Sequence, residues 1–344
     1  MKRFGRMGAV LMVALSMMMV AACGGNNSGG GASAGDSSAP SESAGNSAAA
    51  PAKSITLGFS QVGAESGWRT ANTKSIQDSA KDAGFTLKFS DAQQKQENQI
   101  KAIRSFIQQK VDVIAFSPVV ESGWDTVLKE AKDAGIPVVL TDRAVDSKDT
   151  SLYVTFLGSD FVEEGKKAGQ WLMDQYKDTS EDVNIVELQG TTGSAPANDR
   201  MKGFKDAISS NSHLKIIASQ TGDFTRAKGK EVMQAFLKAH KDIDVLYAHN
   251  DDMALGAIQA IEAAGLKPGV DIKIISVDAV KDGMQAASEG KINFIVECNP
   301  LLGPQLMKVV QDVVDGKTVE TRIVTEETTF TSEQAKEALP NRQY

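Results

Sequence analysis

Residues 55–84 read ITLGFSQVGAESGWRTANTKSIQDSAKDAG, and this stretch sets the fold that we expect for most of the chain. Its apolar start, ITLGFS, predicts a buried strand, and the polar segment from Thr70 onward predicts a helix. Gly84 follows that segment at the position where a helix C-terminus favours a left-handed residue. The turn between strand and helix, residues 60–69, places Trp68 beside Arg69.

Strand-like and helix-like segments alternate along the rest of the chain. Polar, amphipathic segments of helical length, such as residues 95–110 and 123–135, separate further apolar runs. This alternation indicates a parallel sheet covered by helices on both faces. The pattern starts again after residue 160 without a sequence repeat, so we predict an α/β fold with two doubly wound parallel-sheet domains in series. The further strands are predicted at residues 85–90, 111–117, 136–141, 183–190, 214–220, 243–250 and 272–278.

Composition and charge limit the class of protein. The chain has 344 residues, of which 41% are apolar, and a formal net charge of −7. A chain of this size and apolar content can bury one large or two medium cores. An acidic chain repels nucleic acid, so no nucleic-acid partner is expected.

The first 23 residues have the pattern of an export signal. Three basic residues precede an apolar run at residues 8–20 that is too short for an ordinary membrane-spanning helix. The run ends in VAAC, residues 20–23, which resembles the bacterial lipoprotein signal. We therefore expect lipidation of Cys23 and a protein anchored on the extracytoplasmic face of the cell membrane. An ordinary secretory peptide and a buried apolar helix are the alternatives.

Residues 24–53 consist almost entirely of Gly, Ser, Ala, Asn and Pro. Such a segment cannot bury enough apolar surface to offset the entropy lost on ordering. We expect a disordered tether with a root-mean-square reach of about 30 Å.

The residues that follow the predicted strands indicate the kind of ligand. In doubly wound sheets ligands bind outside the carboxyl ends of the strands. These positions, which include residues 61–69, 189–200 and 249–252, are rich in Asp, Asn, Arg, Gln and aromatic side chains. Charged planar groups bond neighbouring hydroxyls in pairs, and an aromatic ring covers the C–H face of a sugar. Trp68 and Arg69 would supply both contacts, unless Trp68 only packs against the next helix and Arg69 is solvated.

Six motifs together resemble those of the sugar-binding proteins of ABC importers, in the ribose, galactofuranose and fructose group. The resemblance covers residues 54–344 and implies the periplasmic binding protein type I-like fold, with two domains joined by a three-segment hinge. It also implies capture of a monosaccharide by domain closure, delivery to ABC permease subunits, no catalysis, no cofactor and a monomer. The motifs are GFSQVGAESGWR (58–69), DAQQKQENQIKAIRSFI (91–107), TDRAV (141–145), SQTGDFTRAKGKEVM (219–233), YAHNDDMALGAIQAI (247–261) and SVDAV (276–280).

The resemblance also implies which residues bind the sugar. Ser66 and Trp68 stand where the ribose binder has an Asn and a stacking Phe, and Arg69 replaces a second aromatic. That departure suggests a ligand with an additional hydroxyl or another ring form. Fructose and galactofuranose are the favoured candidate ligands, followed by ribose and xylose. Phe224 could instead be a core residue at a helix start. The other matched positions are Asp142, Arg143, Arg200, Phe224, Asn250 and Asp278.

Five further residues carry weaker expectations. Glu297 stands where the ribose group has Gln, which adds a carboxylate acceptor, and Glu65 is a candidate from its position alone. Cys298 is expected to pack rather than to react. Asp251 is expected to cap a helix and touch the site, and Asp252 to be solvated. No metal site is expected, because the three histidines lack metal-ligand spacing.

The family topology predicts the domain boundaries. Residues 54–157 and 299–326 would form the first domain, and residues 158–298 and 327–344 the second. Three other functions share parts of this pattern. A sugar-responsive transcription regulator would need a basic helix-turn-helix where the leader and tether stand. A cell-surface glycosidase would turn its sugar over, and a sensor would pass its signal to a receptor.

Overall fold

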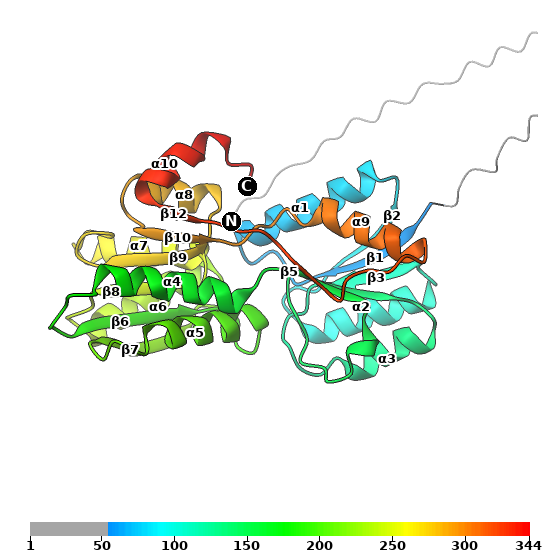
Figure 1. The fold of residues 1–344 in the computed structure, drawn as a ribbon, viewed down its shortest axis with the longest axis horizontal. Helices are drawn as coiled ribbons and strands as arrows, with labels where there is room; N and C mark the ends of the chain where they lie inside the picture. Colours follow the sequence, from blue (N-terminus) through cyan, green and yellow to red (C-terminus); the bar gives the residue numbers. More distant parts are fainter. Residues whose placement is uncertain (1–53) are drawn as a thin grey trace, which may run out of the picture. The chain divides into compact units, whose positions relative to one another are not determined.

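Residues 54–344 are described by a computed structural model. The predicted leader at residues 1–23, with Cys23, and the predicted tether at residues 24–53 lie outside the described residues. The described residues form two six-stranded sheets with helices on their faces (Figure 1). In this part of the chain, no helix combines the length and the apolar character needed to cross a membrane.

The first sheet is parallel throughout, in the order β11-β5-β4-β3-β1-β2. Successive residues of its strands face opposite core layers. Ile114 and Phe116 pack with α2 and α3, whereas Val113 and Ala115 pack with α1 and α9. The elements are β1 (Thr56–Gln61), α1 (Gly67–Asp82), β2 (Thr86–Asp91), α2 (Gln96–Gln108), β3 (Val113–Phe116), α3 (Asp125–Asp133), β4 (Val138–Thr141), the 3₁₀ helix η1 (Thr150–Leu152), β5 (Thr155–Gly158), α9 (Gly303–Val314) and β11 (Arg322–Val324).

The second sheet has the order β12-β10-β9-β8-β6-β7, and only its edge strand β12 is antiparallel to its neighbour. Val186 and Leu246 face a core with α6 and α7, and Ile185 and Val245 face a core with α4 and α5. The elements are α4 (Phe161–Gln175), β6 (Val183–Gln189), α5 (Ala195–Ile208), β7 (Leu214–Thr221), α6 (Arg226–Ala239), β8 (Val245–Ala248), α7 (Asp251–Ala263), β9 (Lys273–Asp278), α8 (Lys281–Ser288), β10 (Phe294–Glu297), β12 (Thr329–Thr331), α10 (Ser332–Ala338) and the 3₁₀ helix η2 (Leu339–Asn341).

The two sheets share one topology. The first five strands of each, β1–β5 and β6–β10, follow the doubly wound order 2-1-3-4-5. The predicted α/β fold with two doubly wound parallel sheets is therefore confirmed. The first sheet domain includes a helix from near the C-terminus, α9, which packs beside α1 (Figure 1). Gly303 N donates to Ser75 Oγ at 3.0 Å in this contact.

The chain passes between the sheets at three places, namely after β5, after β10, and between β11 and β12. Side chains from all three passages meet. Ser159 Oγ lies 3.4 Å from Cys298 Sγ and accepts from Thr325 Oγ1 at 3.3 Å. Thr325 Oγ1 also lies 3.0 Å from Glu327 Oε1, and its single hydroxyl hydrogen can be donated to either acceptor. These contacts tie the three crossing segments together.

Candidate functional site

A small cavity lies at the carboxyl ends of strands from both sheets. The space inside it is about 20 Å³, which is room for about one water molecule. Phe161, Pro196 and Cys298 line it together with ten of the eleven residues that the sequence predicts for ligand binding. Those ten are Glu65, Ser66, Trp68, Arg69, Asp142, Arg143, Arg200, Phe224, Asn250 and Asp278.

The first turn of α1 forms one wall of the cavity. Ser66 caps this helix, and its hydroxyl accepts a hydrogen bond from Arg69 N at 3.1 Å. Trp68 donates its indole N–H to Cys298 O at 2.7 Å, which fixes the ring against a crossing segment. The guanidinium of Arg69 lies 4.7 Å from the centroid of the Trp68 ring. Arg69 is 2% exposed, so it is not a solvated residue.

A buried cluster of charges stands behind this wall. Arg69 pairs through Nη1 with Asp142 at 2.7 Å and through Nε with Glu65 at 3.0 Å. Burial opposes the charge of Arg69, but Asp142 and Glu65 outweigh burial and raise its pKa. Asp142 adopts a left-handed φ of 64° directly after β4, and its carboxylate also accepts from Ser117 Oγ at 2.7 Å. The protein therefore fixes Arg69 and Asp142 before any ligand arrives.

Arg143 is the least satisfied member of the cluster. Its Nη1 donates to Val119 O at 3.2 Å, while Nη2 lies 3.6 Å from Glu65 Oε1 and Nε lies 3.8 Å from Asp142 Oδ2. Within the described residues, Arg143 Nε and Glu65 Oε2 are buried without a hydrogen-bond partner. Burial and the nearby charge of Arg69 lower the pKa of Arg143 to about 10. A ligand hydroxyl, which both accepts and donates, would satisfy groups of this kind.

Arg200 and Asp278 contribute ionisable groups from the second sheet. Arg200 donates from Nε to Glu164 Oε2 and from Nη1 to His249 O, each at 2.6 Å, and lies 5.0 Å from the Phe161 ring centroid. Burial raises the pKa of Asp278 well above its ordinary value, although Arg200 opposes that shift. The Asp278 carboxyl forms no hydrogen bond with residues 54–344. It is therefore available to a ligand in the cavity.

Phe224 belongs to the cavity lining and to the core of the second sheet at once. Its backbone has a left-handed φ of 60°, and its carbonyl accepts from Asn250 Nδ2 at 3.1 Å. Asn250 also caps α7, because its Oδ1 accepts from Met253 N at 3.0 Å. Gly190 leaves room for the ring: a Cβ atom there would lie 1.8 Å from Phe224 Cζ. The position of the ring thus depends on Asn250 and Gly190.

Glu297 is the predicted site residue that the structure places outside the cavity lining. Its carboxylate accepts from Arg342 Nη1 and Tyr344 OH, each at 2.8 Å, and from Thr328 N at 3.1 Å. The C-terminal segment, 45 residues further along the chain, therefore holds the carboxylate that we expected to face the sugar.

Asp251 and Asp252 also differ from expectation. Asn250 rather than Asp251 caps α7. Asp251 is buried and accepts from Ser276 Oγ at 2.5 Å and from Val280 N at 2.8 Å. Asp252 is 6% exposed and therefore not solvated. Neither residue of the acidic pair lines the cavity.

Three lining residues were not among the predicted site residues, although Pro196 lies in the strand-following segment 189–200. Phe161 begins α4 shortly after β5, and Pro196 lies in the first turn of α5. The rule that ligands meet strand ends could have found Phe161, had the four-residue strand before it been recognised. Cys298 was expected only to pack. It lines the cavity, and burial raises the pKa of its thiol.

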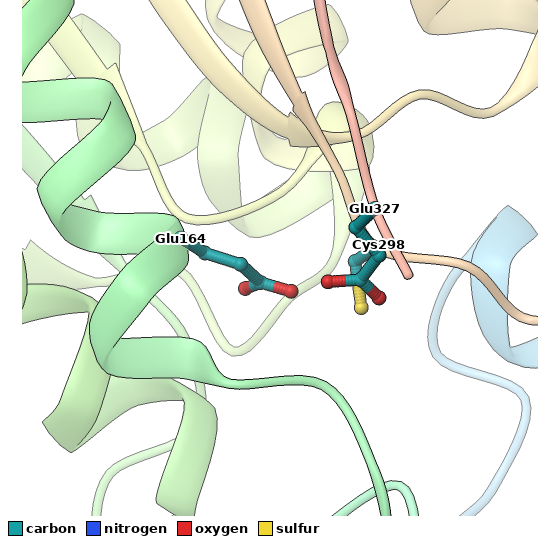
Figure 2. A group of neighbouring side chains, drawn as sticks. All are labelled: Glu164, Cys298 and Glu327. Carbon is teal, nitrogen blue, oxygen red and sulfur yellow. The ribbon is translucent and has the colours of Figure 1, made fainter. Parts of the chain in front are cut away.

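Glu164, Cys298 and Glu327 form a group of side chains beside the cavity, with ligand atoms within 4.8 Å of one another (Figure 2). Two carboxylates and a thiol could hold a divalent cation. However, Glu164 already accepts from Arg200, and Glu327 Oε1 accepts from Ser159, Thr325 and Asn299 N. Burial, with the charge of Glu164, raises the pKa of Glu327 to about 8. Because this pKa lies above 7, the Glu327 carboxyl is mostly protonated and uncharged at neutral pH.

The raised pKa of Glu327 predicts that the free energy of unfolding depends on pH. The pKa of Glu327 rises on folding from 4.5 to about 8, so its contribution to stability is complete below pH 4.5 and is lost as the pH rises to about 8. Gln mimics the protonated acid, so Glu327→Gln should lose less stability than the wild type between pH 5 and pH 8. Thermal unfolding at several pH values measures this, with the exposed Glu333→Gln as control. Parallel curves for Glu327→Gln and wild type would contradict the assignment.

Comparison with known proteins places this site in a family. Residues 57–318 match the family described as periplasmic binding protein domain. The galactofuranose-binding protein YtfQ of Escherichia coli (strain K12) is 51% identical over 304 residues, which cover 87% of this chain and 95% of the relative. The fructose import binding protein FruE of Bifidobacterium longum (strain NCC 2705) is 39% identical over 307 residues, covering 88% of this chain and 91% of the relative.

A solved structure shows the same fold. A protein from Mycobacterium smegmatis, in complex with β-D-fucofuranose, is 65% identical and superposes with a TM-score of 0.83. The match covers 85% of this chain and 96% of that protein. The chain therefore belongs to the periplasmic binding protein family, in the same group as these sugar-binding proteins.

Proposed function

We propose that this protein captures a monosaccharide in its furanose form in the cavity and delivers it to an ABC-type sugar permease, without catalysis. The observation that carries the proposal is the pair of buried, unpartnered atoms among the lining residues, Arg143 Nε and Glu65 Oε2. Unpartnered buried polar atoms are costly, and the hydroxyls of a sugar would satisfy them. The cavity of about 20 Å³ holds about one water molecule, so the lining must move apart before a sugar ring can enter.

The lining offers the two kinds of contact that a sugar needs. Arg143 presents a charged donor to hydroxyls and Asp278 a carboxyl group, and charge-assisted hydrogen bonds are the strong ones. Trp68, Phe161 and Phe224 present aromatic rings to the C–H faces of the ring. The sugars named for the similar proteins, galactofuranose, fructose and β-D-fucofuranose, support a furanose, and we favour fructose or galactofuranose.

We infer that binding closes the protein around the sugar. The first body would be residues 54–157 with 299–326, and the second body residues 158–298 with 327–344. Each body contributes part of the lining, so a sugar that contacts both favours the closed form and shifts the population toward it. Moving this equilibrium from 1:99 to 99:1 requires differential binding of roughly 5.5 kcal/mol, which a few charge-assisted hydrogen bonds supply.

We also propose that the protein is a monomeric lipoprotein, held through Cys23 on the extracytoplasmic face of the membrane. The basic residues, apolar run and VAAC sequence of the leader support this anchor. The anchor and the tether would keep the closed, sugar-loaded protein near its permease.

Calorimetric titration tests the proposed function. The purified protein is titrated with fructose, galactose, ribose, xylose and glucose, and with methyl galactofuranoside as a fixed furanose. We expect saturable binding of one furanose-forming sugar at micromolar concentration or below, and recovery of that sugar unchanged. Absence of binding to every sugar would contradict the monosaccharide proposal. Conversion of the recovered sugar would indicate a glycosidase instead.

A further inference from the structure

The first turns of α1 and α7 meet across the two bodies. Gly67, the first residue of α1, donates its backbone N–H to Asp252 Oδ2 at 2.6 Å, and Asp252 is the second residue of α7. Asp252 is nearly buried and does not line the cavity. Its partner Gly67 lies between Ser66 and Trp68, which do line it. The contact therefore joins the second body to the turn that carries the sugar-binding wall.

The carboxylate of Asp252 is held in place for this contact. Its second oxygen, Oδ1, accepts from Arg226 Nε at 3.0 Å, and Arg226 Nη2 lies 3.1 Å from Asp282 Oδ2. The carboxylate also lies at the N-terminal ends of two helices, α1 and α7, which both favour a negative charge. A charge-assisted bond in such surroundings contributes more than an exposed polar contact.

A second contact between the bodies is more exposed to water than the contact of Asp252 with Gly67. Asn198 Nδ2 donates to Glu121 Oε2 at 2.5 Å, and Glu121 N donates to Gly193 O at 2.9 Å. Asn198 is exposed, so water competes for its side-chain bond in both forms. The contact of Asp252 with Gly67 is better shielded, and opening the bodies would expose both of its members.

We propose that Asp252 is a positioning residue that latches the first turn of α1 to the second body in the closed form and so slows the release of the sugar. The proposal rests on the proposed function, since it requires that the protein closes on a ligand. The bond forms only when the bodies are together, so it stabilises the closed form alone. Because the latch touches no sugar, it should change the dissociation rate of every bound sugar by the same factor.

The test compares variants by stopped-flow Trp fluorescence with the tightest-binding sugar and one weaker sugar. Asp252→Ala should raise the dissociation rate and Kd roughly 10-fold or more, with the association rate and the ratio of Kd values between the two sugars unchanged. Asp125→Ala is the matched control, because Asp125 is also an acidic residue in the first turn of a helix, α3, but is exposed. We expect no change in this control.

Gly67→Pro removes the other half of the latch. Proline is tolerated at the first position of a helix, and Ser66 has the extended backbone that a residue before proline prefers, with φ −146° and ψ 165°. The helix and its cap are thus retained while the N–H is lost, and the ring carbon Cδ takes the place of the hydrogen that points at Asp252 Oδ2. We expect faster release in Gly67→Pro, because the bond is lost and the ring meets the carboxylate. Adding Asp252→Ala should accelerate release no further, because the bond is already broken and the substitution removes that carboxylate.

The outcomes separate the two proposals. An unchanged dissociation rate in Asp252→Ala, additive effects of the two substitutions, or a changed preference between sugars would overturn the latch while leaving sugar capture intact. Failure of the wild type to bind any sugar would overturn the proposed function, and the latch with it. Thermal unfolding of each variant identifies an effect that reflects lost folding instead of lost closure.

Discussion

Replacing Arg143 with alanine is expected to weaken sugar binding by at least about 100-fold and to leave the protein about as stable as the wild type. Two lost hydrogen bonds to a charged donor, at about 1.5–3 kcal/mol each, account for that loss of affinity. Stability should persist because the Arg143 side chain makes one hydrogen bond within the protein, to Val119 O, and its ion pairs are long, at 3.6 and 3.8 Å. Calorimetry and thermal unfolding measure the two effects separately.

The matched control for this prediction is Arg104→Ala. Arg104 also pairs with a carboxylate, Glu130, at 2.8 Å, but on the surface and away from the cavity. We expect its sugar affinity to equal that of the wild type. Retained affinity in Arg143→Ala would remove Arg143 from the site. A large fall in its unfolding temperature would show that the guanidinium serves the fold.

Replacing Gly190 with alanine is expected to have a comparably large effect on binding by a different route. The added Cβ would lie 1.8, 2.2 and 2.4 Å from three ring atoms of Phe224, so the ring must leave its position. The ring lines the cavity, and movement into it would fill space that the sugar needs. We expect a loss of affinity of about 100-fold, together with a strain of typically 1–3 kcal/mol. Calorimetry and denaturant unfolding measure these effects.

A double substitution distinguishes this steric route from a general loss of folding. In Phe224→Ala the ring is absent, so adding Gly190→Ala should weaken binding little further. The two substitutions would then be strongly non-additive. Equal effects of Gly190→Ala in the presence and absence of the ring would mean that Gly190 acts through its backbone instead.

Much of the cavity could be predicted because its residues follow strands whose apolar runs are plain in the sequence. Asp142 directly follows β4 and Asp278 ends β9, and both have positive φ angles of 64° and 118° where the chain turns from the sheet. The carboxyl ends of parallel strands meet at one edge of each sheet. Local pattern and this topological rule together bring such residues into one site.

The remaining residues depend on contacts that sequence pattern does not encode. Glu297 is held by the C-terminal Arg342 and Tyr344, and nothing near Glu297 in the sequence indicates that tail. Asp252 was expected to be solvated, because an acidic residue in the first turn of a helix ordinarily faces water. Its burial arises from Gly67, 185 residues away, and therefore from the packing of one body against the other.

The most direct test of sugar capture is a crystal structure of the protein grown with the sugar that binds most tightly. We expect a single furanose ring in the cavity, with hydroxyls within hydrogen-bond distance of Arg143 and Asp278 and a ring face against Trp68, Phe161 or Phe224. A sugar bound elsewhere on the protein, or a cavity that stays closed to sugar while binding is saturated in solution, would contradict it.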